Sequence, residues 1–212
     1  MKGIKFGNYH SYDDFSLILS QKTIGAPSPK VEAIEIPGGD GALDLTDFFG
    51  EVKYNNRNLS FDFSTIIPQA GFLDLFSRIQ NAIHGQKMQI VLDDDPGWYY
   101  IGRVTVPEWK TERNIGRLTI DCDCEPYKMK VAETVLSTGV QGSITVELWN
   151  GRKKVVPKIT TDAEMKISFG GYSGTFSAGT FTIPELELIE GKNTLTVTGT
   201  GNISFRYREG GL

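Results

Sequence analysis

Three consecutive carboxylates, Asp93-Asp94-Asp95, are the residues in this sequence best suited to chemistry. Hard cations take several oxygen ligands, and glycoside hydrolysis uses two carboxylates across a cleft. The three aspartates directly precede Pro96-Gly97, however, and neither EF-hand spacing nor a second acidic cluster accompanies them. Because Asp is a frequent turn residue, the pattern favours a solvated turn over a cation site or a catalytic carboxylate pair.

The glycine-rich string Ile36–Asp44 (IPGGDGALD) could in principle cradle a phosphate. It has neither the G-K-[S/T] of a phosphate loop nor a G-x-G-x-x-G that opens a helix. Pro37 fixes its own φ, and the glycines permit the positive φ of a tight reversal. The string therefore predicts a sharp turn and no nucleotide cofactor.

Nucleophilic and metal chemistry find little support in the other residues. The sequence has no G-x-S-x-G, and nothing near His10 or His84, its only histidines, marks either as a general base. Cys122 and Cys124 fall on one face of a strand, which is poor geometry for a disulfide, and no ligand spacing links them to a histidine. We therefore expect two buried thiols, and no catalytic, cofactor-binding or metal-binding residue.

Two aromatic groups could contact a sugar. Tyr9-His10 and Trp98-Tyr99-Tyr100 would suit carbohydrate stacking, although the same residues could alternate between the core and the surface of a sandwich. Trp109 and Trp149 are expected to be buried, since large aromatic side chains usually are.

The sequence predicts one helix, Pro68–Gly85, among the segments that must position these residues. Its apolar residues form one stripe at a 3.6-residue period, and Pro68 before it and Gly85 after it suit the two ends of a helix. The stripe predicts core packing. Its members are Phe72, Leu75, Phe76, Ile79 and Ile83.

The rest of the chain alternates with the period of β-strands. The predicted strands before residue 130 are 31–36, 52–65, 87–92, 98–106 and 115–124, with a hairpin turn at DDDPG. Those after it are 143–149, 164–169, 186–189, 193–198 and 202–207. The fold class is therefore mainly β: an N-terminal β-sandwich-like domain with one α-helix, followed by a smaller C-terminal β-sandwich.

Composition places the domain boundary near residue 130. Residues 131–212 hold 12 of the 24 glycines, and their eight basic and eight acidic residues cancel, so the whole net charge of −4 belongs to residues 1–130. Short alternating strands with glycine turns indicate a small sandwich or jelly roll in the second part. We predict domains at 1–130 and 131–212.

Charge and hydropathy exclude two classes of function. With 22 basic and 26 acidic residues, the 212-residue chain lacks the excess of Lys and Arg by which proteins grip a phosphate backbone. No apolar stretch approaches the roughly 20 residues that cross a bilayer, and the N-terminus has no signal-peptide core. A soluble, unsecreted chain is expected.

Several short motifs, in this order along the chain, resemble the distal tail proteins of siphophages, a family often called Dit. Their order and spacing are more specific than any one of them, and they span nearly the whole chain. The motifs are Phe6-Gly7-Asn8-Tyr9-His10-Ser11, Asp14-Phe15, IPGGDGALDLT at 36–46, Tyr54-Asn55-Asn56-Arg57, the helix ending at Gly85, DDDPGWYYIGRV at 93–104, CEPY at 124–127 and the closing segment 191–212.

The resemblance implies a structural protein of the phage virion. Residues 1–130 would be a belt domain that forms a hexameric ring at the tip of the tail tube, and residues 131–212 a galectin-like sandwich. The ring would join the tail-tube protein to the tail-associated lysin or fibre hub and let DNA pass without specific binding. The implied protein is not an enzyme, and it is assembled in the bacterial host cytoplasm.

Two further expectations follow from the residues. Acidic side chains of residues 1–130 should outnumber basic ones on the lumen wall, because a basic wall would retard passing DNA. Tyr54 and Arg57 are candidate interface residues, since Tyr and Arg are frequent interface anchors, and a solvated strand edge would explain them equally well. The alternative function is a carbohydrate-binding module for attachment to the host cell wall.

Overall fold

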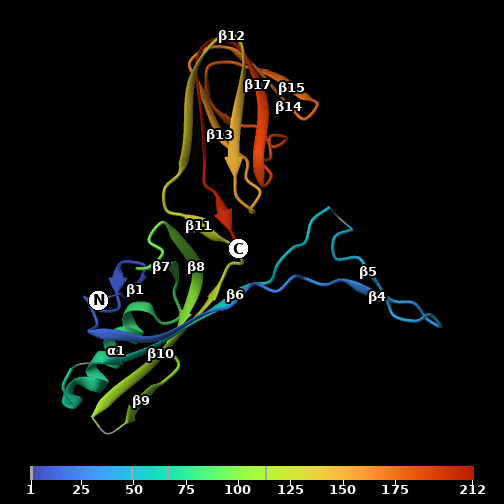
Figure 1. Ribbon diagram of the computed structural model, residues 1–212. Helices are drawn as coiled ribbons and strands as arrows, with labels where there is room; N and C mark the ends of the chain where they lie inside the picture. The colour runs from blue at the N-terminus through green and yellow to red at the C-terminus, as the bar shows by residue number, and fades with distance from the viewer. Residues whose placement is uncertain (1, 49, 66, 113) are drawn as a thin grey trace. The chain divides into compact units, whose positions relative to one another are not determined.

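The computed structural model describes residues 2–48, 50–65, 67–112 and 114–212. The chain divides into two compact units, residues 1–128 with Leu212, and residues 129–211 (Figure 1). The described residues form β-strands, one short 3₁₀ turn and one α-helix. The predicted mainly β fold with one helix and β-sandwich architecture is confirmed. No helix among the described residues is long and apolar enough to cross a membrane.

The first unit is built on one antiparallel sheet with strand order β2-β1-β7-β8-β10-β6-β3, to which β9 adds beside β10. Its strands are β1 (Ile4–Phe6), β2 (Tyr9–His10), β3 (Leu17–Ile24), β6 (Arg57–Thr65), β7 (Lys87–Leu92), β8 (Trp98–Thr105), β9 (Trp109–Glu112) and β10 (Ile115–Cys124). A separate pair, β4 (Ala33–Glu35) and β5 (Ala42–Asp44), forms a two-stranded sheet of its own. Along β6, every second side chain from Arg57 to Thr65 is buried, as the alternation predicts.

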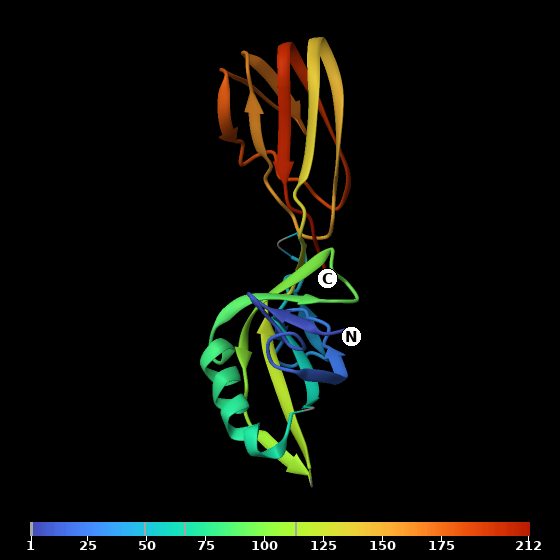
Figure 2. The same cartoon turned by 90° about the vertical axis from the view of Figure 1, so that its left-hand side faces the viewer.

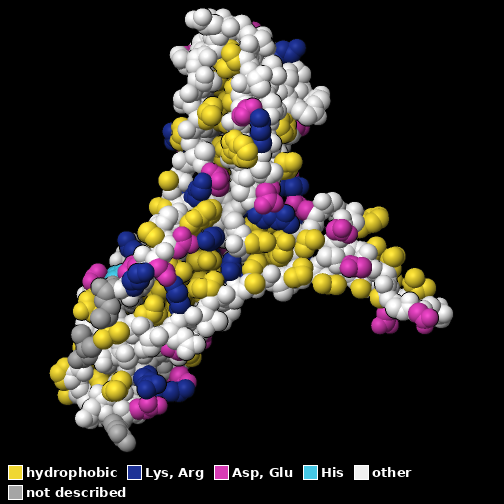
Figure 3. Space-filling model, in the orientation of Figure 1, with side chains coloured by type: hydrophobic (Ala, Val, Ile, Leu, Met, Phe, Trp, Pro, Cys, Tyr) yellow, Lys and Arg dark blue, Asp and Glu magenta, His cyan; other side chains and the backbone are white. Residues whose placement is uncertain are grey.

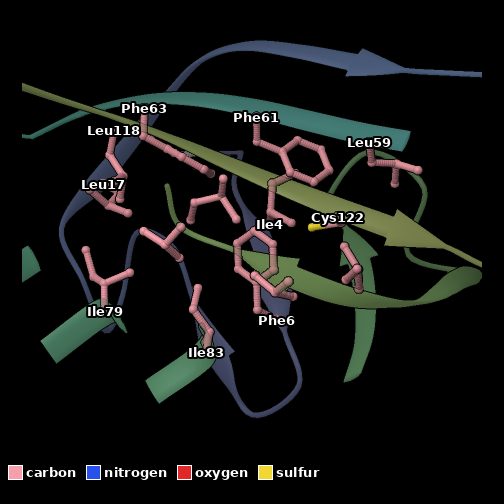
Figure 4. Close-up of a cluster of buried hydrophobic side chains, with 14 of the residues drawn as sticks. Ile4, Phe6, Leu17, Leu59, Phe61, Phe63, Ile79, Ile83, Leu118 and Cys122 are labelled. Carbon is pink, nitrogen blue, oxygen red and sulfur yellow. The ribbon is translucent and has the colours of Figure 1, made fainter. Parts of the chain in front are cut away.

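Helix α1 (Phe72–Ile83) follows a 3₁₀ turn, η1 (Gln69–Gly71), and lies along one face of this sheet (Figure 2). The predicted stripe is confirmed, because four of its five residues are buried and the fifth, Phe76, is half-buried. Ile79 and Ile83 point from the helix toward Phe6 and Leu17 (Figure 4). The stripe therefore packs into the core, and the helix covers one face of the sheet and leaves the opposite face uncovered by it.

Cys122 and Cys124 lie on the buried face of β10 and are free, as predicted. Burial is the main reason that the pKa of the Cys124 thiol rises to about 12, and it raises the pKa of Cys122 as well.

Alkylation kinetics test this placement, because only the thiolate attacks an alkylating reagent. At pH 8 we expect iodoacetamide to label the folded protein at least about a hundredfold more slowly than the denatured chain, measured by mass spectrometry. Because the folded pKa is raised above the ordinary 9.0, the first unit should also lose stability as the pH rises from about 9 toward 12. Equal labelling rates would show that the sheet opens readily at β10.

The second unit is organised by one long antiparallel pair, β12 (Thr134–Asn150) and β17 (Gly191–Tyr207). The first half of β17 also pairs with β14 (Met165–Phe169), which pairs with β15 (Tyr172–Phe176). The second half of β17 pairs with β13 (Lys158–Thr161), which pairs with β16 (Gly179–Thr182). The two short remaining strands, β11 (Lys128–Lys130) and β18 (Gly210–Gly211), pair with each other.

Two glycines allow β17 to change partners midway. Gly199 and Gly201 have φ of +155° and +148°, and a Cβ at Gly199 would come within 2.9 Å of the Glu164 carbonyl oxygen. The predicted strands 193–198 and 202–207 are therefore one bent strand, and the prediction of two was wrong because glycines that mark a turn can also mark a bend. The predicted strand 186–189 was also wrong: of this segment only Leu188 pairs, in a single bridge to Val155.

Candidate interaction surface

The three consecutive aspartates do not converge on a common point. Each contacts a different basic or imidazole group of the first unit, in a turn between β7 and β8. The contact with Lys22 lowers the pKa of the Asp94 carboxyl. The partners are, in order, His10 (Nε2 to Asp93 Oδ2, 3.1 Å), Lys22, and Lys128 (Nζ to Asp95 Oδ2, 2.8 Å). This arrangement ties the turn to neighbouring segments, as expected of a structural turn.

Other candidates for chemistry also have structural roles. The first part of the glycine-rich string, residues 36–41, is the turn between β4 and β5, where the Gly39 N–H donates to the Ile36 carbonyl (3.0 Å). Its last three residues form β5, so the prediction of a turn holds only for the first part. Within the described ranges, no group of three or more His, Cys, Asp or Glu side chains could hold a metal ion. Tyr99 and Tyr100 are buried, so they offer no stacking surface for a sugar.

The tryptophans divide between core and surface. Trp109 is half-buried and packs against Phe72 and Phe76, with ring centroids 5.3 and 5.9 Å away. Trp149 is 62% exposed, so the prediction that it is buried was wrong. On β12 its neighbours Leu148 and Asn150 face inward, and the alternation of the strand therefore turns Trp149 to solvent.

The most exposed part of the first unit is a two-stranded ribbon, residues 26–56, which we call the arm (Figure 1). It leaves the sheet after β3 and returns at β6, and its centre is the β4–β5 pair. Backbone pairing continues between the β4–β5 pair and the sheet. There the Lys30 N–H donates to the Lys53 carbonyl and the Asn55 N–H donates to the Ser28 carbonyl, both at 2.8 Å. Every residue of β4 and β5 is exposed, and an isolated two-stranded ribbon of this kind is only marginally stable in water.

The arm exposes large apolar side chains. Five of them are more than half exposed, and none of the arm's described residues is part of the buried core. Figure 3 shows these hydrophobic side chains beside acidic ones on the arm, at the right of the view. Clustered apolar exposure of this kind is typical of an interaction surface. The five are Val31, Ile34, Ile36, Leu43 and Phe48.

The arm is also acidic. Residues 26–56 hold six acidic and two basic side chains, a net charge of −4 that equals the charge of the whole chain. The remainder of the protein is therefore neutral overall. A surface that covers the arm needs apolar side chains with Lys or Arg among them.

Tyr54 and Arg57, the predicted interface residues, lie at the root of the arm. Arg57 is only 7% exposed, and its Nε donates to the Gly25 carbonyl (2.7 Å) while its guanidinium lies 5.2 Å from the Tyr100 ring centroid. Tyr54 is half-buried and packs edge-on against Tyr127. These contacts fix the point at which the arm leaves the sheet. Contact of either residue with another subunit stays a prediction.

The open face of β6 and β10 carries three carboxylates, which we call the acidic face: Asp62, Asp121 and Asp123. Each accepts a hydrogen bond from a neutral donor, and none forms an ion pair within the part of the chain that the structure describes. A hollow of about 380 Å³ opens beside Asp62. The donors are Thr119 Oγ1 (2.7 Å), Ser60 Oγ (2.7 Å) and Asn56 Nδ2 (3.2 Å), in the same order.

Comparison with known proteins identifies the fold. No family model matches the sequence, and no curated protein matches it. Among solved structures, the chain is similar to the Dit protein (gp 19.1) of SPP1, described as a paradigm of the hub adsorption apparatus in phages that infect Gram-positive bacteria. The TM-score is 0.71 at 15% sequence identity, over 98% of this chain and 99% of that one. The chain therefore has the Dit fold along its whole length.

Proposed function

We propose that this chain is a structural protein of a siphophage tail tip, and that its first unit forms a ring, most simply a hexamer. The arm is the observation that carries the proposal. It is an exposed apolar ribbon that its own unit leaves uncovered, and a neighbouring copy in a closed ring would cover it once per subunit. The full-length similarity to an adsorption-apparatus protein supports the same role.

The acidic face suits the wall of a DNA conduit. The outward positions of β6, β8 and β10 carry three aspartates against two cations, Arg103 and Arg117. The aspartates accept hydrogen bonds from neutral donors, while Arg103 lies directly across from Asp123, and Lys110 and Arg117 line the hollow beside Asp62. Since this face has no excess of Lys and Arg, it would give passing DNA no strong attraction, and DNA would move through the lumen without being bound.

The partners follow from this position in the virion. One side of the ring would contact the tail-tube protein, and the other the tail-associated lysin or fibre hub. The ring would be assembled in the bacterial host cytoplasm and needs no catalytic residue, cofactor or membrane contact. The division of labour would place ring formation in residues 1–130 and a peripheral sandwich in residues 131–212.

Size-exclusion chromatography with light scattering, run at several protein concentrations, tests the proposal. We expect a mass near six times 23.5 kDa at high concentration and ring-shaped particles in negative-stain micrographs. A chain that stays monomeric at millimolar concentration, with no ring on a grid, would contradict the proposal.

A further inference from the structure

We propose that the free edge of β12 in the second unit binds an extended, uncharged segment of a different polypeptide chain, which adds to the sheet as a further strand. The site lies within residues 129–211, so it is separate from the arm. Strand β12 leaves one side of its backbone unpaired, lacks the features that protect other edges of this chain, and carries a hollow with apolar side chains in its lining.

The backbone of β12 is paired on one side only. Within the described ranges its sole partner strand is β17, which runs beside it over all 17 residues. Figure 2 shows β12 in yellow, beside β17 in red, at the right-hand side of the unit. Between Val135 and Glu147, no other described segment forms a backbone hydrogen bond with β12. Alternate N–H and C=O groups of such an edge point away from the sheet, and the backbone of another strand matches their spacing.

Other sheet edges of the chain carry the features by which proteins discourage strand addition. In the second unit, the edge strands β15 and β16 have only five and four residues. In the first unit, the edge strand β3 has a register shift after Leu19 and carries Lys22. Strand β12 is long and regular and contains no Pro, Lys or Arg, and its single charged residue, Glu147, is paired with Lys192 (2.5 Å). Its edge is therefore open to a further strand.

The core of the second unit is incompletely covered at this edge. A hollow of about 360 Å³ lies along β12, and every residue that lines it belongs to β12, so the hollow is at the free edge and not between β12 and β17. Leu136 and Ile144, two of the lining residues, are only half-buried although they pack against the core. An added strand would place apolar side chains in the hollow and remove these two from water.

The groups along the edge define the chemistry of the segment that binds there. Its backbone must be extended in order to pair with an extended edge, and its inward side chains must be apolar in order to enter the hollow. It needs no charge, because the one carboxylate of β12 already has a lysine partner. It also needs a small residue near its middle, since β12 itself has Gly142 at a φ of +80° there, with Gly199 of β17 opposite.

A second copy of this chain does not meet the geometric requirement. Two identical strand edges pair about a two-fold axis, whereas neighbouring copies in a ring of more than two subunits are related by a different rotation. This step rests on the proposed ring. It leaves one free β12 edge on each subunit for a different chain.

The probe is a fluorescein-labelled peptide that copies Leu195–Phe205 of β17 and is added to the full-length protein. This peptide is uncharged, alternates apolar and polar residues and contains the two glycines of the bend. By fluorescence polarisation we expect micromolar binding. Hydrogen exchange should show alternate amides between Val135 and Glu147 that exchange fast in the free protein and are protected by the peptide. A peptide with Thr196→Pro and Ser204→Pro keeps the apolar side chains but cannot pair as a strand, so it should not bind.

Thr138→Lys tests the site in the protein. Thr138 is half-buried and lines the hollow, so a lysine there places a charge where the added strand would bury it, while in the free protein the ammonium group reaches water. We expect peptide binding to weaken at least about tenfold. Thr194→Lys is the matched control, because Thr194 is exposed on β17, and it should change the affinity less than about twofold. If Thr138→Lys unfolds, Ile144→Thr removes an apolar contact without adding charge and should weaken binding at least about threefold.

Thermal unfolding of each variant checks that the second unit remains folded. Absence of peptide binding would overturn the proposal, as would wild-type affinity in a folded Thr138→Lys variant. Loss of assembly in Thr138→Lys, measured by light scattering, would show that a second copy occupies the edge and that the assignment to a different chain is wrong. A wild-type protein that binds the peptide but forms no ring would contradict the proposed ring and support the strand site, so the two failures are distinguishable.

Discussion

Replacement of the arm, residues 26–56, by a short Asn-Gly turn is expected to abolish ring formation and leave a folded monomer. The ends of β3 and β6 already lie side by side, because Ile24 pairs with Leu59 and the Gly25 N–H donates to the Asn58 carbonyl (2.9 Å). A short turn can therefore close the gap as a hairpin. Light scattering of the variant should give the monomer mass at every concentration at which the wild type assembles.

The deletion should cost the first unit little stability. No described arm residue belongs to its hydrophobic core, and the deletion removes the Tyr54–Tyr127 contact and the Asn56–Asp123 hydrogen bond, so the free energy of unfolding is expected to fall by only about 1–2 kcal/mol. Circular dichroism and urea unfolding measure this. An arm-less variant that still forms rings would remove the arm from the interface, whereas an unfolded variant would show that the arm is needed for folding.

A milder variant tests whether the arm's exposed apolar side chains, rather than the mere presence of the arm, drive assembly. The triple change Val31→Ser, Ile34→Ser and Leu43→Ser keeps the ribbon's length and charge but removes three of its five exposed large apolar side chains. We expect assembly to shift to at least about tenfold higher protein concentration. Leu73→Ser is the matched control, because Leu73 is 73% exposed on α1 and lies outside the arm.

The sequence predicted the elements whose periodicity is set by a buried face. Helix α1 and strands β7 and β10 were predicted because one side of each packs into the core. The β12–β17 pair was predicted in pieces, since glycines at the bend resemble turn residues in a single sequence. Strand β3 was missed: its exposed half, from Ser20 to Thr23, is polar and shows little alternation.

The candidate site was harder to predict for a physical reason. In the arm, Ile34 and Leu43 face each other across β4 and β5 but are exposed. The segment of Ile34 was predicted as a strand, whereas Leu43 fell in the string predicted as a sharp turn, so β5 was missed. Only the structure shows that these side chains are uncovered. The available signal was charge: the six acidic residues between 26 and 56 account for the chain's whole excess. Trp149 gave no such signal, because its exposure depends on strand register.

Arg57 is expected to position the base of the arm through contacts within its own subunit, and not to contact a neighbouring subunit directly. Its buried guanidinium donates to the Gly25 carbonyl and lies over the Tyr100 ring, and its NH1 lies 3.5 Å from the Pro126 carbonyl oxygen. Arg57→Ala removes this donor from two part-buried carbonyls and the cation from the Tyr100 ring. We therefore expect a loss of about 2–4 kcal/mol in the free energy of unfolding of the first unit, measured with urea.

The matched control is Arg103→Ala, because Arg103 is exposed and donates one hydrogen bond, to the Gly85 carbonyl. Its cost should be below about 1 kcal/mol. Light scattering then distinguishes the two roles of Arg57. If Arg57 positions the arm, the variant loses stability as a monomer and assembles less readily as a consequence. If Arg57 contacts a neighbouring subunit directly, monomer stability stays at the wild-type value while assembly fails, and the root assignment is wrong.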